Sequence, residues 1–218
     1  MKLLLTSAGV TNASIRSALV ELLGKPVSEA HALVIPTAVY PMSGPAAAWR
    51  VITGQSRTPL SEIGWKSLGV LELTALPSLG RDTWLPWVEE ADALLLSGGD
   101  ALYLAHWARE SGLPELLPSW EGVCVGVSAG SMVMAPHVGE EFVEWRPPTG
   151  GDEALGIVDF AIFPHLDHPL LPENSTADAT GWAARLPCPG YAIDDETAVT
   201  VVDGAVEVVS EGHWKLFA

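Results

Sequence analysis

A Gly-x-Ser-x-Gly pentapeptide, Gly126 to Gly130, is the stretch of this sequence best suited to chemistry. The β-branched apolar run Val123 to Val127 leads into it, and an apolar stretch that can form a helix follows. At such a strand-to-helix corner a serine sits on a sharp turn with its hydroxyl exposed, and flanking glycines allow close backbone approach. Ser128 is therefore a candidate nucleophile, and the N–H of Ala129 is a candidate donor to a developing negative charge. The alternative interpretation is a tight turn without chemistry.

A serine nucleophile needs a base, usually a histidine oriented by a carboxylate. His165 follows a buried apolar strand and a proline, so we expect it at a strand's carboxyl end, at the same sheet edge as Ser128. His168 lies close by, and with Asp167 the pair could in principle ligate a metal. No metal site is expected, because the chain has no HExxH helix and no cysteine partners for one. The remaining histidines are interpreted as surface or packing residues: His31, His106, His137 and His213.

The best candidates for the orienting acid follow a short strand that begins at Tyr191. Three acids stand there together, Asp194, Asp195 and Glu196, and strand alternation places Asp195 on the opposite face from its two neighbours. The alternative is a solvent-facing acidic turn. Two further carboxylates compete for the role, Glu141 and Glu144.

A glycine pair follows another predicted strand, 93–96, in the sequence Ser97-Gly98-Gly99-Asp100. Glycines at the carboxyl end of a parallel strand let the backbone turn and present an N–H to the crevice where open α/β sheets bind ligands. Gly98 or Gly99 could therefore supply the second donor of an oxyanion hole.

Alternating strands and helices predict a doubly wound α/β fold, and the continuous apolar strands are typical of a parallel sheet covered on both faces. We expect one domain over residues 1–218, with a strand-rich part from Tyr191 to Phe217 that includes a hairpin turn at Asp203-Gly204. A helix is expected between Asn12, its N-cap, and Gly24, which ends it. Other helices are expected at 46–52, 60–68, 82–90, 101–110 and 177–186, and strands at 2–6, 32–35, 70–73, 93–96, 123–127 and 156–163.

The composition limits the kinds of binding partner and the cellular location that we expect for the protein. A net charge of −16 makes nucleic acid an unfavourable partner, and the low charged fraction of 17% suggests that some apolar surface is buried in a homodimer. The N-terminal apolar run is too short for a signal peptide, and no stretch approaches the roughly 18 apolar residues of a membrane span. Cys124 and Cys188 are expected to be unpaired in a reducing compartment, so a cytoplasmic location is predicted.

Four segments together resemble a known family in order and spacing: Leu96 to Asp100, Gly126 to Ser131, Phe163 to His165 and Ile193 to Ala198. They resemble the peptidase E (aspartyl dipeptidase) family and the related cyanophycinases. The resemblance implies a class I glutamine amidotransferase-like fold, a three-layer doubly wound sheet with a serine where amidotransferases carry cysteine. The resemblance also implies that the reaction needs no cofactor.

The resemblance also implies roles for individual residues. Ser128 would be the nucleophile and His165 the base, and the backbone of Gly98 or Gly99 with Ala129 would form the oxyanion hole. The third member of the family's triad is typically a glutamate, and Asp195 falls at its position here, with Glu196 as the fallback.

Two departures from the family concern specificity. Aspartyl dipeptidases use an arginine after the catalytic histidine to pair with the substrate's aspartate, but this chain has only Arg185 between His165 and Asp195. The preference for Asp-X peptides is therefore doubtful. Asp100 stands where the family often has asparagine, and its carboxylate could bind the α-ammonium of a peptide.

The sequence thus predicts a serine exopeptidase, a dipeptidase or aminopeptidase that cleaves short peptides through an acyl-enzyme on Ser128. The alternatives are a cyanophycinase-like hydrolase and a non-catalytic amidotransferase-like binding or regulatory domain.

Overall fold

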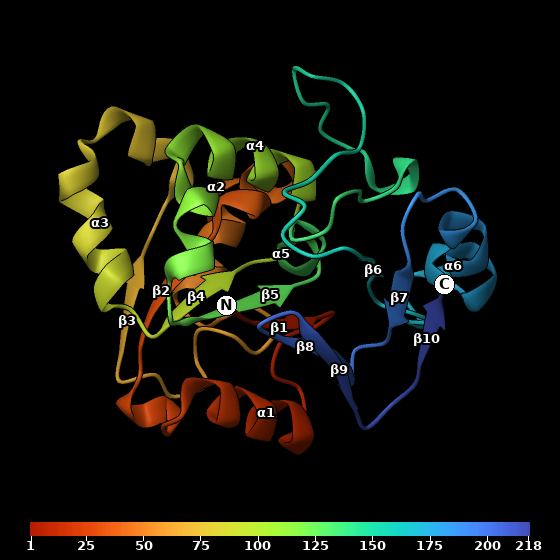
Figure 1. Ribbon diagram of the computed structural model, residues 1–218, viewed down its shortest axis with the longest axis horizontal. Coiled ribbons are helices and arrows are strands. Elements are labelled where there is room, and N and C mark those ends of the chain that lie inside the picture. The colour runs from red at the N-terminus through yellow and green to blue at the C-terminus, as the bar shows by residue number, and fades with distance from the viewer.

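The computed structural model describes all residues from 1 to 218 and is built around a seven-stranded sheet (Figure 1). Its strand order is β3-β2-β4-β5-β1-β8-β9. The first five strands run parallel to one another, β8 is antiparallel to β1, and β9 is antiparallel to β8. The expected mostly parallel α/β sheet is confirmed. The strands are β1 (Lys2–Thr6), β2 (His31–Ile35), β3 (Ser67–Val70), β4 (Ala93–Leu96), β5 (Val123–Val127), β8 (Thr197–Val202) and β9 (Ala205–Ser210).

Helices cover both faces of this sheet, and the alternation of strand side chains explains why. In β1, Leu4 points into a core shared with α1, whereas Leu3 and Leu5 point into a larger core shared with α3 and α4. All three leucines are fully buried, as a parallel sheet covered on both faces requires. The α-helices are α1 (Ala13–Leu23), α2 (Tyr40–Ile52), α3 (Arg81–Glu90), α4 (Ala101–Ser111), α5 (Ala129–Met132) and α6 (Thr176–Ala183).

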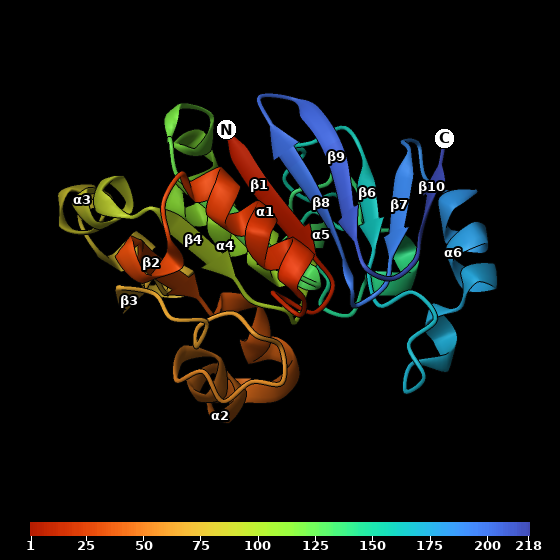
Figure 2. The same ribbon diagram turned by 90° about the horizontal axis from the view of Figure 1, so that it is seen from below.

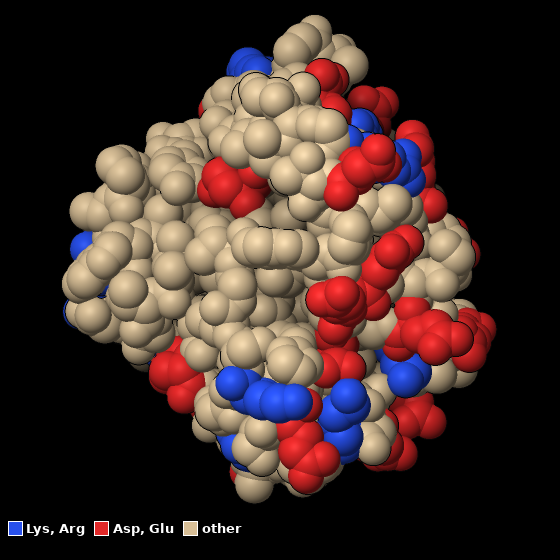
Figure 3. All heavy atoms as spheres, turned by 90° about the vertical axis from the view of Figure 1, so that its left-hand side faces the viewer, with Lys and Arg blue, Asp and Glu red and all other residues tan.

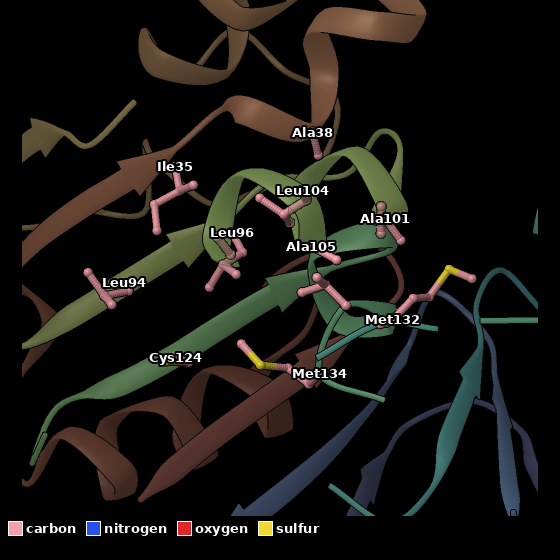
Figure 4. Close-up of a cluster of buried hydrophobic side chains, with 14 of the residues drawn as sticks. Ile35, Ala38, Leu94, Leu96, Ala101, Leu104, Ala105, Cys124, Met132 and Met134 are labelled. Atoms are coloured by element: carbon pink, nitrogen blue, oxygen red, sulfur yellow. The ribbon is translucent and has the colours of Figure 1, made fainter. Parts of the chain in front are cut away.

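The larger core supports the carboxyl ends of β4 and β5 from one side (Figure 4). Small residues of α4, Ala101 and Ala105, allow this helix to pack closely against α5 and the strands, and Leu104 fills the space beside them. Cys124 of β5 lies in the same core, where burial raises the pKa of its thiol to about 12. That thiol therefore stays protonated and acts as a small apolar group.

A second sheet of three strands lies beside the first, with α6 against it (Figure 2). Its order is β10-β7-β6, where β6 (Ala161–Phe163) and β7 (Gly190–Ile193) are parallel and β10 (Trp214–Phe217) is antiparallel to β7. Trp182 of α6 is fully buried against Phe163 of β6 and donates its indole N–H to the carbonyl of Val138. His165 was expected at the same sheet edge as Ser128, but the strand that precedes it, β6, belongs to this separate sheet.

Several boundaries also differ from expectation. The third strand was expected at 70–73 after a helix at 60–68, but β3 ends at Val70 and the preceding residues form turns. Parallel pairing with β2 fixes the register from His31 opposite Ser67, and Glu72 then caps a 3₁₀ helix by accepting the N–H of Thr74. Leu71 and Leu73 are buried in this turn rather than in a strand, which explains why an apolar run was misleading.

The expected strand 156–163 is shortened to β6 for a similar reason. Residues before it hydrogen-bond to the turn that follows α5: the N–H groups of Gly156 and Ile157 donate to Ala135 and Met134. The expected helix 177–186 is α6, which begins one residue earlier and ends at Ala183. Short 3₁₀ helices complete the chain at Val27–Glu29, Thr37–Val39, Leu73–Ser78, Leu113–Glu115, Leu117–Ser119, Glu140–Phe142 and Pro172–Asn174.

Local signals were more reliable at α1 and at the hairpin. Asn12 caps α1 by accepting the N–H of Ile15, and Gly24 ends it in the left-handed conformation. The turn at Asp203 and Gly204 joins β8 to β9 as expected. None of the helices combines the length and the apolar character needed to cross a lipid bilayer.

Candidate active site

Ser128 lies on a strained corner between β5 and α5. Its backbone has φ 51° and ψ −112°, a conformation that L-residues rarely adopt and that costs of order 1–3 kcal/mol. The flanking glycines make the corner possible: a Cβ on Gly126 would lie 2.5 Å from the carbonyl oxygen of Gly130, and a Cβ on Gly130 would lie 2.2 Å from that of Leu96. The pentapeptide therefore forms the strand-to-helix corner expected from the sequence, although α5 has only four residues.

Hydrogen bonds to β1 hold this corner in place. The fully buried Ser131 donates its hydroxyl to the carbonyl of Thr6 at 2.8 Å and accepts the N–H of the same residue at 2.8 Å. The N–H of Ser128 also donates to the Thr6 carbonyl at 2.9 Å, and the Thr6 hydroxyl donates to Gly126 at 2.7 Å. The nucleophile candidate is thus fixed by the end of a central strand, which suits a preorganised site.

His165 and Asp195 come from the carboxyl ends of two neighbouring strands of the second sheet, β6 and β7. The His165 Nδ1 and Asp195 Oδ1 atoms are 2.6 Å apart, and Nε2 of His168 lies 3.6 Å from the other oxygen of Asp195. His165 has a positive φ of 56°, so its backbone too is held in a rarely populated region. The parallel pairing of β6 with β7 is what brings the two side chains together.

The other candidate acids lie elsewhere. Glu196 accepts a hydrogen bond from Asn12, Glu141 pairs with Arg185, and Glu144 forms no hydrogen bond or ion pair with His165. Asp195 is the one acid among those proposed that is hydrogen-bonded to the imidazole of His165.

The electrostatic setting of Asp195 favours its ionised form. Partial burial raises the pKa of this carboxyl, but the hydrogen bond from His165 and the charges of His165 and His168 lower it more, so the net pKa lies below its ordinary value. Asp195 is therefore a carboxylate near neutral pH, able to hold the imidazole in one orientation and to stabilise an imidazolium.

The glycine pair after β4 lies beside Ser128. A Cβ on Gly98 would lie 3.5 Å from the Ser128 Cβ, and Gly99 takes a positive φ of 134° where a side chain would collide with the carbonyl of Ala38. The N–H groups of Gly98 and Gly99 have no acceptor within the protein. Ala129 occupies the first position of α5, where a helix leaves its N–H groups unpaired. These three N–H groups therefore remain available as candidate donors for an oxyanion hole.

A cleft of about 570 Å³ opens over Ser128 and His165 on the side of α6. We call it the acidic cleft, because its wall contains five carboxylates and a single arginine: Asp100, Glu141, Glu144, Glu173, Asp178 and Arg185. The structure contains no hydrogen bond between Ser128 and His165; such contacts between nucleophile and base often tighten only when substrate binds.

Asp100 lines the acidic cleft but also holds the protein together. Its carboxylate accepts the N–H of Tyr103, which caps α4, and the N–H of Trp145, each at 2.8 Å, and the residue is 3% exposed. A role as a ligand for a peptide's ammonium group stays a prediction. Arg185 reaches the same cleft, and its pairing with Glu141 offsets its charge.

Sequence reasoning missed the contribution of Ser7. Its fully buried hydroxyl accepts the N–H of His165 at 3.0 Å and donates to the carbonyl of Ile193 at 2.9 Å, so the end of β1 binds the segments that carry both His165 and Asp195. Its position directly after a central parallel strand was the available signal.

His213 is a second residue whose place the sequence did not reveal. Its Nδ1 lies 2.9 Å from Asp194 and its Nε2 lies 3.1 Å from Asp167, so it joins the turn before Asp195 to the loop after His165. The Asp167 carboxylate also accepts hydrogen bonds from the N–H and the hydroxyl of Thr176, so both of its oxygens serve in structural contacts. No three His, Cys, Asp or Glu side chains are grouped so as to hold a metal ion.

Comparisons with known proteins identify a family and similar folds. The model of peptidase family S51 matches residues 3–209, nearly the whole chain. Among solved structures, a candidate peptidase E protein from Listeria monocytogenes EGD-e superimposes with a TM-score of 0.67 at 16% identity, covering 97% of this chain and 98% of its own. A peptidase from an acI-B1 Actinobacterium superimposes with a TM-score of 0.65 at 21% identity, and the match covers 98% of this chain and 88% of that protein's chain. No curated protein matches the sequence.

Proposed function

We propose that this chain, which belongs to peptidase family S51, hydrolyses short peptides through an acyl-enzyme formed on Ser128. Membership of the family supports a peptidase, and the choice of nucleophile, base and acid is our inference. The observation that carries it is the 2.6 Å contact between His165 and Asp195 in a site that also exposes Ser128 on a strained corner. A nucleophile, a base and an orienting acid are the parts that acyl transfer needs.

The mechanism follows from these positions. Asp195 accepts a hydrogen bond from the Nδ1–H group of His165, which leaves Nε2 unprotonated as the base. His165 removes the Ser128 proton as the Oγ attacks the scissile carbonyl, and the N–H groups of Gly98 or Gly99 and of Ala129 stabilise the oxyanion. His165 then gives that proton to the leaving amine as the C–N bond breaks. Water, deprotonated by the same imidazole, hydrolyses the ester and restores Ser128.

The acidic cleft favours substrates with a free amino terminus. Glu144 and Glu173 line it without forming an ion pair with any lysine or arginine, so a positively charged α-ammonium gains from their field. The same field disfavours an aspartate side chain in the cleft, since the charge of Arg185 is already offset by Glu141. We therefore propose an exopeptidase whose first substrate residue is not acidic, and the aspartate-rich polymer of a cyanophycinase suits the cleft less well.

Hydrolysis of a dipeptide panel tests the proposal. Asp-X, Met-X, Leu-X and Ala-X dipeptides are incubated with the wild type and with Ser128→Ala, and a serine-directed phosphonate is followed by mass spectrometry. We expect cleavage by the wild type, a loss of several orders of magnitude in Ser128→Ala, and labelling at Ser128. Absence of both cleavage and labelling would instead indicate a binding or regulatory domain.

We also propose that two copies of the chain associate through the face that carries β3 and α3. Figure 3 shows a broad part of this face without charged side chains, although the chain has 27 acidic residues. Val70, Leu79 and Trp87 are exposed there, and β3 is the edge strand of the large sheet. Apolar exposure at a sheet edge is typical of an interface.

The two free cysteines suit a reducing compartment, which agrees with a cytoplasmic location.

A further inference from the structure

A second cavity opens on the other side of Ser128, and we propose that Arg50 in its wall binds the free α-carboxylate of the residue that leaves. The enzyme would then be a dipeptidase that requires an unblocked carboxyl terminus rather than an aminopeptidase for chains of any length. This inference rests on the proposed function and specifies the class of substrate for that site.

The cavity adjoins the reacting atoms. It has a volume of about 310 Å³, and its wall includes Ser128, His165 and both glycines of the pair that follows β4. Because Ser128 and His165 line this cavity as well as the acidic cleft, a peptide bond placed at Ser128 has one residue in each space. The volume lies at the lower end of the range for small-molecule sites, which suits one amino-acid residue and little more.

The charges on the two sides of Ser128 are opposite. The second cavity has no Asp or Glu in its wall, and Arg50 is the one lysine or arginine there. The guanidinium of Arg50 forms no ion pair within the protein, unlike that of Arg185 in the acidic cleft. A guanidinium presents a planar fork of donors that matches a carboxylate in a bidentate manner. Apart from Ser128 and His165, the remaining polar side chains of the cavity wall carry hydroxyls: Ser7, Ser43, Ser56, Thr58 and Ser97.

The hydroxyl of Ser97 provides a second, independent indication of a ligand. Ser97 is 2% exposed and its Oγ has no hydrogen-bond partner within the protein, although it belongs to the wall of this cavity. A buried hydroxyl without a partner is unfavourable, and an acceptor bound in the cavity would satisfy it.

This separation of charge fixes the direction of the substrate. A dipeptide has an ammonium at one end and a carboxylate at the other, so its amino-terminal residue belongs in the acidic cleft and its carboxyl-terminal residue beside Arg50. In a longer peptide the carboxylate lies at least one residue farther from Ser128, about 3.3–3.6 Å of extended chain, and cannot occupy the same position.

The test compares three substrates that share the best amino-terminal residue X from the panel: X-Ala, X-Ala amide and X-Ala-Ala. We expect kcat/KM of the wild type for X-Ala to exceed that for the amide by about 10- to 100-fold, the range of one charge-assisted hydrogen-bonded contact. In Arg50→Met the X-Ala value should fall by that factor, mainly through KM, so that acid and amide become equal. Arg50→Lys should keep part of the preference. Arg57→Met is the matched control, because Arg57 lies between Ser56 and Thr58 but does not line the cavity.

Two results would overturn the inference: equal kcat/KM for X-Ala and its amide in the wild type, or an equal loss for both substrates in Arg50→Met. Calorimetry with Ser128→Ala, which cannot turn over, gives a readout that does not depend on the chemistry. There X-Ala should bind more tightly than X-Ala amide, and adding Arg50→Met should remove the difference. If Ser128 is not labelled and no peptide is cleaved while X-Ala still binds through Arg50, the proposed chemistry fails and the carboxylate site stands.

Discussion

The hydroxyl of Ser7 accepts the backbone N–H of His165 at 3.0 Å. It donates at the same time to Ile193, two residues before Asp195, so one buried side chain at the end of β1 binds both segments that supply the base and the acid. The large sheet, which carries Ser128, is thereby joined to the small sheet at the candidate active site.

Replacing Ser7 by alanine should therefore lower kcat more than it raises KM. We expect a loss of about 10- to 100-fold in kcat, because small displacements of catalytic groups carry such costs. Steady-state kinetics on the best dipeptide checks this, and circular dichroism establishes that Ser7→Ala folds. Ser119→Ala, at an exposed serine remote from the site, should leave both constants unchanged. A rise in KM at constant kcat would argue against a positioning role for Ser7.

Asp195→Asn and Glu196→Gln form a matched pair that tests the identity of the acid. Asp195 contacts His165, whereas Glu196 contacts Asn12. We expect kcat to fall by about 10⁴-fold in Asp195→Asn, as when the acid of a serine triad can no longer fix the tautomer of its histidine. Glu196→Gln should remain within about threefold of the wild type, well below the factor of ten that 1.36 kcal/mol of barrier represents. The reverse ranking would transfer the role to Glu196.

The low pKa of Asp195 also predicts how stability depends on pH. Its pKa in the folded protein lies below the ordinary value of 3.8, so its contribution to the free energy of unfolding is fully present above that value and is lost as the pH falls through the folded-state pKa. Urea denaturation at pH 7, 5, 4 and 3 should show the wild type losing more stability than Asp195→Asn below pH 4. Asp159→Asn, at an exposed carboxylate outside the site, should follow the wild type. Parallel curves for the wild type and Asp195→Asn would contradict this.

The strained backbone of Ser128 should be detectable in two inactive variants. Ser128→Ala keeps a side chain in the unfavourable conformation, whereas Ser128→Gly removes the clash at φ 51°. Part of the gain is offset by the greater flexibility of glycine when unfolded, so we expect Ser128→Gly to be about 1 kcal/mol more stable than Ser128→Ala. For a chain of this length that is a rise in Tm of roughly 2–4 °C. Differential scanning calorimetry of both variants measures this difference in Tm. An equal or lower Tm for Ser128→Gly would mean that the backbone at the corner is not strained.

Measuring the oligomeric state tests whether two copies of the chain associate through the face that carries β3 and α3. Light scattering should give about twice the chain mass of 23.1 kDa for the wild type, and a lower mass for Trp87→Glu, which places a charge on an apolar surface. Leu170→Glu makes the same kind of change at an exposed leucine remote from β3 and should leave the mass unchanged. A monomeric wild type would refute the proposed association.

The sequence predicted those parts of the fold that depend on local geometry. Gly126 and Gly130 fixed the corner at Ser128 because only residues without a side chain fit there, and the residues that cap α1 marked both of its ends. What it did not reveal depends on contacts between distant segments. β10 pairs with β7 to make a separate sheet, and His213 reaches Asp194 only through that pairing. The same applies to Ser7, whose partner His165 lies 158 residues away.

Because the candidate triad is divided between two sheets, catalytic activity depends on how those sheets pack against each other. Ser128 belongs to the large sheet, while His165 and Asp195 follow strands of the small one. A local opening between the sheets would separate the nucleophile from its base while each sheet kept its own hydrogen bonds. Enzymatic activity would then disappear at a lower denaturant concentration than secondary structure, and loss of turnover would precede loss of fold.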